Sequence, residues 1–148
     1  MHAVDWGTFE RAAPPLAAVG RTRLHGRVAY LGTIRGDGAP RVHPVTPIVS
    51  KHVLYIFMEP TSPKGKDLRR DPRFTLHAGV EDNNGGEGEF ALSGKAGLVT
   101  DAAERQRAVA ASSYVPAERY ILFALNVSEA LCTTYEEDGP SRTRWPNG

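Results

Sequence analysis

The sequence has little of what marks disulfide frameworks, membrane spans and secretion. Its one cysteine, Cys132, cannot form an internal disulfide, which suits a reducing compartment. No apolar run approaches the roughly 20 residues that a membrane-spanning helix requires. The N-terminal segment MHAVDWGTFERAA lacks the basic start and apolar centre of a signal peptide. We therefore expect a cytoplasmic protein with no membrane partner.

The chain also lacks an excess of charge and the usual catalytic constellations. Lysine and arginine number 18 against 17 acidic residues, so we expect no nucleic-acid partner. The five histidines have no close ligand spacing with cysteines or carboxylates, so we expect no metal site. No serine stands in a nucleophile-elbow context, and Cys132 in an apolar run is typical of a buried small side chain. Catalytic side chains are not identified, and an enzyme of this sequence would need a cofactor to supply the chemistry.

Short apolar segments separated by turn residues are what the sequence does contain. Helices are predicted at 5–21, with a break at Pro14 and Pro15, and at 62–70 and 102–112. The whole chain, 1–148, suits a single domain. The pattern predicts a mainly β (α+β) fold, an antiparallel barrel of six or seven strands with short flanking helices. The predicted strands are 28–34, 41–49, 53–58, 74–80, 89–99, 120–127 and 131–136.

The first predicted strand is apolar on both faces. Val28, Tyr30 and Ile34 alternate with Ala29 and Leu31. One face can fill the barrel, and the other then needs cover from helices or from a second subunit. We expect a homodimer on this ground.

Two prolines interrupt the second predicted strand, 41–49. Pro44 and Pro47 cannot donate ladder hydrogen bonds, which confines such a strand to an edge, a bulge or a strand end. Two interpretations remain open. The strand is an edge protected from aggregation, or its free backbone groups serve a planar ligand.

The segment 52–72 leads from a buried strand into the start of a helix. Ser62 is a helix N-cap and Pro63 occupies the first helical position, where no N–H is needed. Lys64 and Lys66 follow in the first turn, where cations oppose the helix dipole unless an anion binds there. Gly65 between them is expected to let a ligand approach the backbone. The segment is either a phosphate cradle or an ordinary solvated basic helix.

Three stretches together carry a family resemblance. AYLGTIRGDGAPRVHPV, LYIFMEPTSPKGKDLRRDPR and SGKAGLVTD resemble the pyridoxamine 5′-phosphate oxidase-like family of FMN-binding split barrels. The resemblance covers about residues 26–110 well and the rest loosely. It implies a split β-barrel, a homodimer with FMN at the subunit interface, and a flavin-dependent oxidoreductase acting on a small-molecule substrate.

The resemblance also implies which residues bind the flavin. Ser62 and Lys64 would hold the phosphate. Pro63 stands where the family has an arginine, and His43 stands where it often has one, so both departures weaken the expected affinity for FMN. Lys66 could partly compensate, and a deazaflavin coenzyme is the alternative cofactor. The full set of expected cofactor-binding residues is His43, Pro44, Val45, Thr46, Pro47, Ile48, Phe57, Met58, Ser62, Pro63, Lys64 and Lys66.

The C-terminal tail, SRTRWPNG, is basic and aromatic. It does not reproduce the segment that holds the substrate phosphate in the oxidase, so little or no oxidation of pyridoxine phosphate is expected. Arg142, Arg144 and Trp145 are candidate substrate residues, in the same chain or over the partner's site, and a frayed terminus is the alternative. A planar, weakly charged substrate is favoured. A non-catalytic flavin-binding module competes with the enzyme, since both need the cradle and neither needs a side-chain acid or base.

Overall fold

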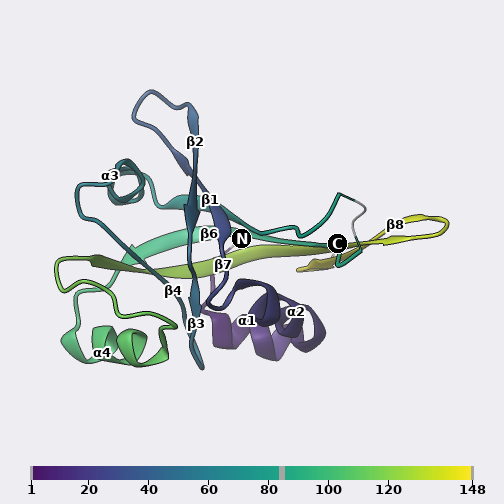
Figure 1. Ribbon diagram of the computed structural model, residues 1–148, viewed down its shortest axis with the longest axis horizontal. Coiled ribbons are helices and arrows are strands. Elements are labelled where there is room, and N and C mark those ends of the chain that lie inside the picture. Colours follow the sequence, from purple (N-terminus) through teal and green to yellow (C-terminus); the bar gives the residue numbers. More distant parts are fainter. Residues whose placement is uncertain (1, 84–85, 148) are drawn as a thin grey trace.

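The computed structural model describes residues 2–83 and 86–147, and an antiparallel sheet dominates it (Figure 1). The strands are β1 (Ala29–Ile34), β2 (Pro40–Val45), β3 (Ile48–Val49), β4 (Leu54–Met58), β5 (Arg73–Ala78), β6 (Glu89–Leu98), β7 (Ile121–Glu136) and β8 (Gly139–Trp145). The helices are α1 (Trp6–Ala12), α2 (Pro14–Leu24), α3 (Pro63–Arg70) and α4 (Ala102–Ala111). The strand order is β2-β1-β5-β6-β7-β4-β3, with β8 paired to β7. The predicted mainly β, antiparallel fold with short flanking helices is confirmed, with eight strands in the sheet.

The two N-terminal helices form where the sequence predicts one helix with a break. The Asp5 side chain accepts a hydrogen bond from the Thr8 N–H at 2.8 Å and starts α1. Ala13 ends α1, and α2 begins at Pro14, a position that needs no N–H donor. Both helices lie on one side of the sheet (Figure 1), where Trp6 and Phe9 are fully buried in the core.

The predicted strand 41–49 divides into two. β2 ends at Val45, Pro47 lies in the gap, and β3 keeps only two residues. β2 stands at the end of the strand order, so Pro44 lies in an edge strand, opposite Tyr30 of β1. An edge is where a strand tolerates a residue without a donor.

The prediction of two separate strands at 120–127 and 131–136 is wrong. β7 runs unbroken for 16 residues, because Glu129 and Ala130 pair with β6 rather than forming a turn. A register shift between Ser93 and Gly94 absorbs the extra residue. A Cβ at Gly94 would lie 1.7 Å from the Asn126 carbonyl oxygen, so only glycine fits at the bulge. The extra residue is Ser128 of β7, and Gly94 lies opposite the bulge.

The C-terminal tail is a strand and not a frayed end. A turn at 137–138 returns the chain as β8, which pairs with β7 and forms a hairpin that projects from one end of the molecule (Figure 1). The Trp145 ring lies 5.1 Å from the Phe9 ring and packs against the main core. Trp145 thus ties the base of the hairpin to α1.

A buried arginine attaches α2 to the turn that precedes β6. Arg23 is 6% exposed, and its guanidinium donates to the carbonyl oxygens of Gly79 at 2.7 Å, Glu87 at 2.9 Å and Gly88 at 3.1 Å. Within the described residues, no carboxylate pairs with it. Backbone carbonyl oxygens therefore accept the hydrogen bonds of both terminal nitrogens of this buried guanidinium.

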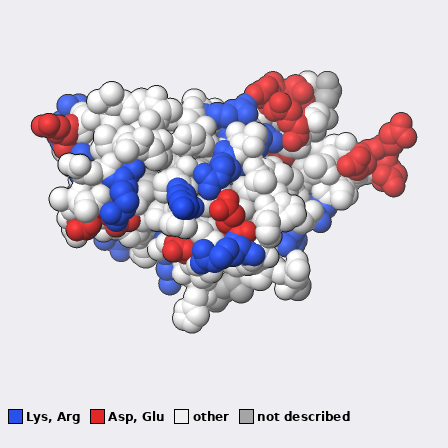
Figure 2. Space-filling view, turned by 90° about the horizontal axis from the view of Figure 1, so that it is seen from below, with Lys and Arg blue, Asp and Glu red and all other residues white. Residues whose placement is uncertain are grey.

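The face of the molecule on the helix side carries both signs of charge (Figure 2). Seen from the helix side, basic and acidic side chains are interspersed over the body, and acidic side chains gather on two protrusions at one end (Figure 2). This distribution agrees with the net charge of +1. No described helix has the length and apolar character needed to cross a membrane.

Candidate functional site

A pocket of about 320 Å³ lies where β2 and β4 end, beside the start of α3 and below the segment that follows α4. We call it the lysine pocket, and residues 112–120, which form one of its walls, the tyrosine loop. The pocket contains six of the twelve residues expected to bind a cofactor, from three separate stretches of the chain. Its lining consists of Pro44, Val45, Thr46, Phe57, Met58, Glu59, Lys64, Tyr114 and Tyr120.

The helix that carries Lys64 begins as predicted. Ser62 is the N-cap of α3: its hydroxyl accepts from the Gly65 N–H at 3.2 Å and donates to the Glu59 carbonyl oxygen at 2.7 Å. Pro63 follows at the first helical position. The Ser62 hydroxyl is thus engaged within the chain, and would have to release Glu59 to donate to a ligand.

Gly65 serves packing. A Cβ there would lie 3.0 Å from the Ser62 Oγ and 3.3 Å from both the Glu59 carbonyl oxygen and the Met58 Sδ. Gly65 is buried against the end of β4, so the expectation that it opens the backbone to a ligand is wrong. Its missing side chain lets α3 sit close on β4.

Lys64 is the cation of the pocket. Its side chain is partly buried, and this burial lowers the pKa of the ammonium group. Among the described residues, no carboxylate lies within ion-pair distance of it. A desolvated cation with no counter-charge favours an anionic ligand. Lys66, by contrast, is exposed and lies outside the pocket lining.

His43 lies on β2 close to the same charges. Its Nε2 is buried and has no hydrogen-bond partner among the described residues. Burial lowers the pKa of His43, the charges on Lys64 and Arg41 lower it further, and Asp67 opposes them. The imidazole is therefore neutral near pH 7, and His43, although expected to bind the cofactor, does not belong to the lining of the lysine pocket.

A buried carboxylate fixes α3 against the β1–β2 hairpin. Asp67 accepts from the Thr33 hydroxyl at 2.8 Å, from Arg41 Nε at 2.8 Å and from Arg70 at 2.9 Å. Asp67 and Thr33 are each 2% exposed. The position of Lys64 relative to β2 thus depends on this cluster, which the sequence analysis missed because Thr33 and Asp67 are 34 residues apart along the chain.

The tyrosine loop is the other part of the site that the sequence analysis missed. Tyr114 and Tyr120 line the pocket together with Lys64 and the end of β4, and burial raises the pKa of Tyr114. Arg119 donates from Nε to both oxygens of Glu59, at 2.9 and 3.0 Å. This ion pair joins the loop to the end of β4 across the pocket mouth and lowers the pKa of Glu59.

Two predicted residues support the pocket from behind. Ile48 is 0% exposed and belongs to a core cluster with Tyr55, Phe57 and Leu122. Pro47 is buried, and its carbonyl oxygen accepts from the Gly26 N–H at 3.0 Å. Neither residue lines the lysine pocket in this chain.

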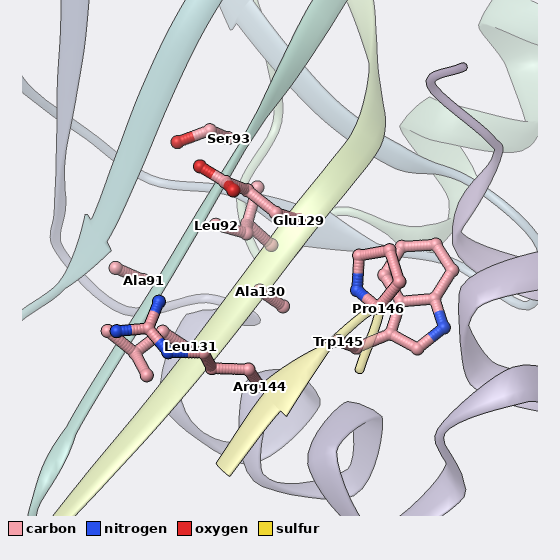
Figure 3. A pocket seen from close by; sticks show the side chains of 9 residues that line it. All are labelled: Ala91, Leu92, Ser93, Glu129, Ala130, Leu131, Arg144, Trp145 and Pro146. Carbon is pink, nitrogen blue, oxygen red and sulfur yellow. The ribbon is translucent and has the colours of Figure 1, made fainter. Parts of the chain in front are cut away.

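The predicted substrate residues lie elsewhere. Arg144 and Trp145 line a second hollow of about 240 Å³ between β6, β7 and β8 (Figure 3). Arg144 extends over Leu131, and Glu129 lies beside Ser93 in the same hollow (Figure 3). Arg142 is exposed on β8. Within one chain, the structure does not bring these β8 residues to the lysine pocket, since α3 and the β7–β8 hairpin lie toward opposite ends (Figure 1).

The described residues contain no group of three or more histidine, cysteine or acidic side chains arranged to hold a metal ion. The polar side chains at the lysine pocket are instead one lysine, two tyrosines, one threonine and a glutamate held by an arginine. This set can bind an anion at one end and an aromatic group at the other.

Solved structures share the fold at low sequence identity. A heme binding protein from Mycobacterium smegmatis aligns with a TM-score of 0.66 and 19% identity over 85% of this chain, which spans 57% of that protein. PhzG from Burkholderia lata 383, solved with tetrahydrophenazine-1-carboxylic acid, aligns with a TM-score of 0.64 and 15% identity over 95% of this chain and 87% of its own. HutZ, the heme storage protein of Vibrio cholerae, aligns with a TM-score of 0.56 and 12% identity over 78% and 89%.

No curated protein sequence matches the chain. The family model for pyridoxamine 5′-phosphate oxidase matches residues 21–131, which include β1 to β6, α3, α4 and every residue of the lysine pocket. The eight-stranded antiparallel sheet and the structural neighbours agree with this match. The chain belongs to the pyridoxamine 5′-phosphate oxidase family.

Proposed function

We propose that the chain binds FMN, with the phosphate at Lys64, and acts as a flavin-dependent oxidoreductase on a small conjugated molecule. The observation that carries the proposal is Lys64, a partly buried lysine without an ion-pair partner among the described residues. It lies in the first turn of α3, where an anion also gains from the helix dipole. The residues present fit a phosphate at this end of the pocket.

The protein's own residues bind and orient the cofactor. The β2 backbone at 44–46 and the Phe57 ring border the rest of the lysine pocket, so a planar group can lie against them. The neutral imidazole of His43 precedes this backbone on β2, with its Nε2 buried and outside the pocket lining. FMN when bound supplies hydride or electron transfer, which is why the site needs no side-chain nucleophile of its own.

Two departures from the family pattern bear on the cofactor. Pro63 has no charge to offer a phosphate, and Lys66 points into solvent. With fewer fixed cations, we expect a lower affinity for FMN. A deazaflavin is therefore the competing cofactor. Because structural neighbours include heme-binding proteins, heme is a third outcome of the same test.

The absorption spectrum of the purified protein comes first, because flavin, deazaflavin and heme absorb differently. Titration of flavin fluorescence then compares wild type with Lys64→Ala and Lys66→Ala. Lys66 is the matched control, since it is an exposed lysine two residues away on the same helix. Lys64→Ala should weaken FMN binding by about 1.5–3 kcal/mol, the range for a hydrogen bond to a charged group, and Lys66→Ala should change it far less. Equal losses in both variants would refute the role of Lys64.

We also propose a two-fold homodimer. Three apolar side chains are exposed at the β1–β2 edge of the sheet: Val28 by 54%, Tyr30 by 47% and Val42 by 65%. Tyr30 lies on β1, Val42 lies on β2, and Val28 immediately precedes β1. A second copy can cover these side chains, and its Arg142 and Arg144 are then candidates for the substrate end of this chain's pocket. Sedimentation measures the assembly, and a 16.1 kDa species at micromolar concentration would contradict the dimer.

The substrate we propose is planar and weakly charged. The aromatic lining formed by Phe57, Tyr114 and Tyr120 favours such a molecule. Turnover of pyridoxine phosphate by the flavin-loaded protein should stay well below about 1 per second. To separate an enzyme from a binding module, reduced flavin is reoxidised with and without candidate acceptors. No acceptor faster than air would favour the binding module.

A further inference from the structure

Arg105 connects α4 to the tyrosine loop. Its Nη1 donates to the Tyr120 carbonyl oxygen at 2.7 Å, and its Nη2 donates to the carbonyl oxygens of Glu118 at 3.1 Å and Ala117 at 3.4 Å. Within the described part of the chain, Arg105 has no carboxylate partner. Its donors are therefore directed at the backbone of the loop that carries the pocket's two tyrosines.

The same guanidinium also touches the opposite wall. Its central carbon lies 5.1 Å from the centroid of the Phe57 ring, a cation–π distance. Phe57 is the last residue but one of β4 and lines the lysine pocket, as do Tyr114 and Tyr120. The guanidinium of Arg105 thus contacts both Phe57 of β4 and the backbone of the tyrosine loop.

We propose that Arg105 is a positioning residue that sets the width of the lysine pocket between Phe57 and the tyrosine loop, and with it the selectivity for a planar aromatic ligand. A lysine cannot replace it, because a single ammonium group lacks the flat fork that reaches several carbonyls while stacking on a ring. The phenols and the carbonyls around it are uncharged, so the wall that Arg105 holds favours an uncharged aromatic surface over an ionic one.

The inference rests on the proposed flavin site only for the identity of the ligand. The position of the wall can be tested without any ligand. Nitration by tetranitromethane, located by mass spectrometry, reports how accessible Tyr114 and Tyr120 are. Arg105→Met should raise their nitration rates several-fold, and Arg107→Met should leave them at the wild-type rates, since Arg107 is an exposed arginine on the same helix.

Binding of riboflavin and FMN provides the second readout. Riboflavin lacks the phosphate, so its affinity reports the aromatic walls, and the FMN-to-riboflavin ratio reports the phosphate contact. Arg105→Met should weaken both ligands by a similar factor, roughly 10-fold, which corresponds to about 1.4 kcal/mol. The ratio should stay at its wild-type value, whereas Lys64→Ala should lower the ratio. Arg105→Lys should behave as Arg105→Met does, because it keeps the charge and loses the fork.

The outcomes separate the two claims. If the wild type binds neither flavin, the proposed function fails and the nitration contrast decides the role of Arg105. If Arg105→Met folds as the wild type does by circular dichroism and shows wild-type nitration and wild-type riboflavin binding, the inference is overturned. If Arg105→Met does not fold, Arg105→Lys carries the test, and full rescue by Arg105→Lys would also overturn the inference.

Discussion

Asp67 offers a sharp test of how α3 is held. Asp67→Asn preserves the side-chain volume and removes the charge that faces Arg41 and Arg70. Removing one partner of a buried ion pair costs about 3–5 kcal/mol. The side chains of Arg41 and Arg70 are 29% and 46% exposed, so both can rehydrate in part. We expect the free energy of unfolding to fall by about 2–3 kcal/mol, discounted for this exposure.

The assay is urea unfolding followed by tryptophan fluorescence, with fully buried Trp6 as one reporter. For a chain of this size the same loss lowers the melting temperature by roughly 6–10 °C. Glu10→Gln is the control, because the side chains of Glu10 and Arg21 are 39% and 37% exposed. An ion pair exposed to this extent contributes about 0–1 kcal/mol to the free energy of unfolding. A double-mutant cycle with Thr33→Val should show coupling of about 0.5–3 kcal/mol, since the hydroxyl donates to the same carboxylate.

The pH dependence follows from the same contacts. Burial alone would raise the pKa of Asp67, but the hydrogen bonds from Thr33, Arg70 and Arg41 outweigh it and hold the pKa below its ordinary value. The carboxylate therefore contributes its full stability above the unfolded-state pKa, about 3.9, and loses it as the pH falls through the lower folded value. The stability gap between wild type and Asp67→Asn should be constant from about pH 7 to 5 and narrow below about pH 4. A loss no larger than that of Glu10→Gln, or a gap that does not narrow, would refute the reasoning.

Further predictions concern the bulge and the buried arginine. Gly94→Ala should destabilise the fold severely, because its Cβ would overlap the Asn126 carbonyl. Gly97→Ala should be close to neutral, since no atom lies within 4 Å of its Cβ. Thermal melts that rank the two variants equally would contradict the assigned bulge. Arg23→Met should lower the free energy of unfolding by at least about 2 kcal/mol, because it leaves carbonyls of Gly79 and Gly88 without their donor. Urea titration measures this loss, and Arg27→Met, at an exposed ion pair with Glu81, is the control.

Local signals in the sequence predicted what depends on neighbouring residues. The N-caps at Asp5, Ser62 and Asp101 each accept from an N–H three residues later, so they could be identified from short patterns. The break at Pro14 follows equally from the special backbone properties of proline. These features need no knowledge of distant contacts.

Features that depend on distant pairing were missed. The sequence of β7 suggested two strands because residues 128–130 are polar or small, yet β6 pairs with residues 129–130 and continues on the far side of the bulge. β8 looked like a loose tail because its side chains are mostly exposed, and only its pairing with β7 makes it a strand. The continuity of β7 and the existence of β8 each depend on pairing with another strand, which a single stretch of sequence does not reveal.

The candidate site divides in the same way. The residues of the strand ends and the helix start, including Phe57 and Lys64, were expected from the family resemblance, and the structure does bring them into one pocket. Tyr114 and Tyr120 were not expected, because the tyrosine loop reaches the pocket through contacts such as Arg119 with Glu59, 60 residues apart. No short motif signals such a contact.

Arg23 and Arg105 each hold a loop by its carbonyl oxygens and not by its side chains. Every residue type carries the same carbonyl, so these anchors do not depend on which side chains the loop presents. Substitutions at Glu87 or Glu118 would keep the hydrogen bonds that fix the path of the backbone. The tyrosine loop can therefore exchange its side chains over evolutionary time while its backbone stays in place, which makes it a site where related proteins can acquire different ligand preferences on an unchanged scaffold.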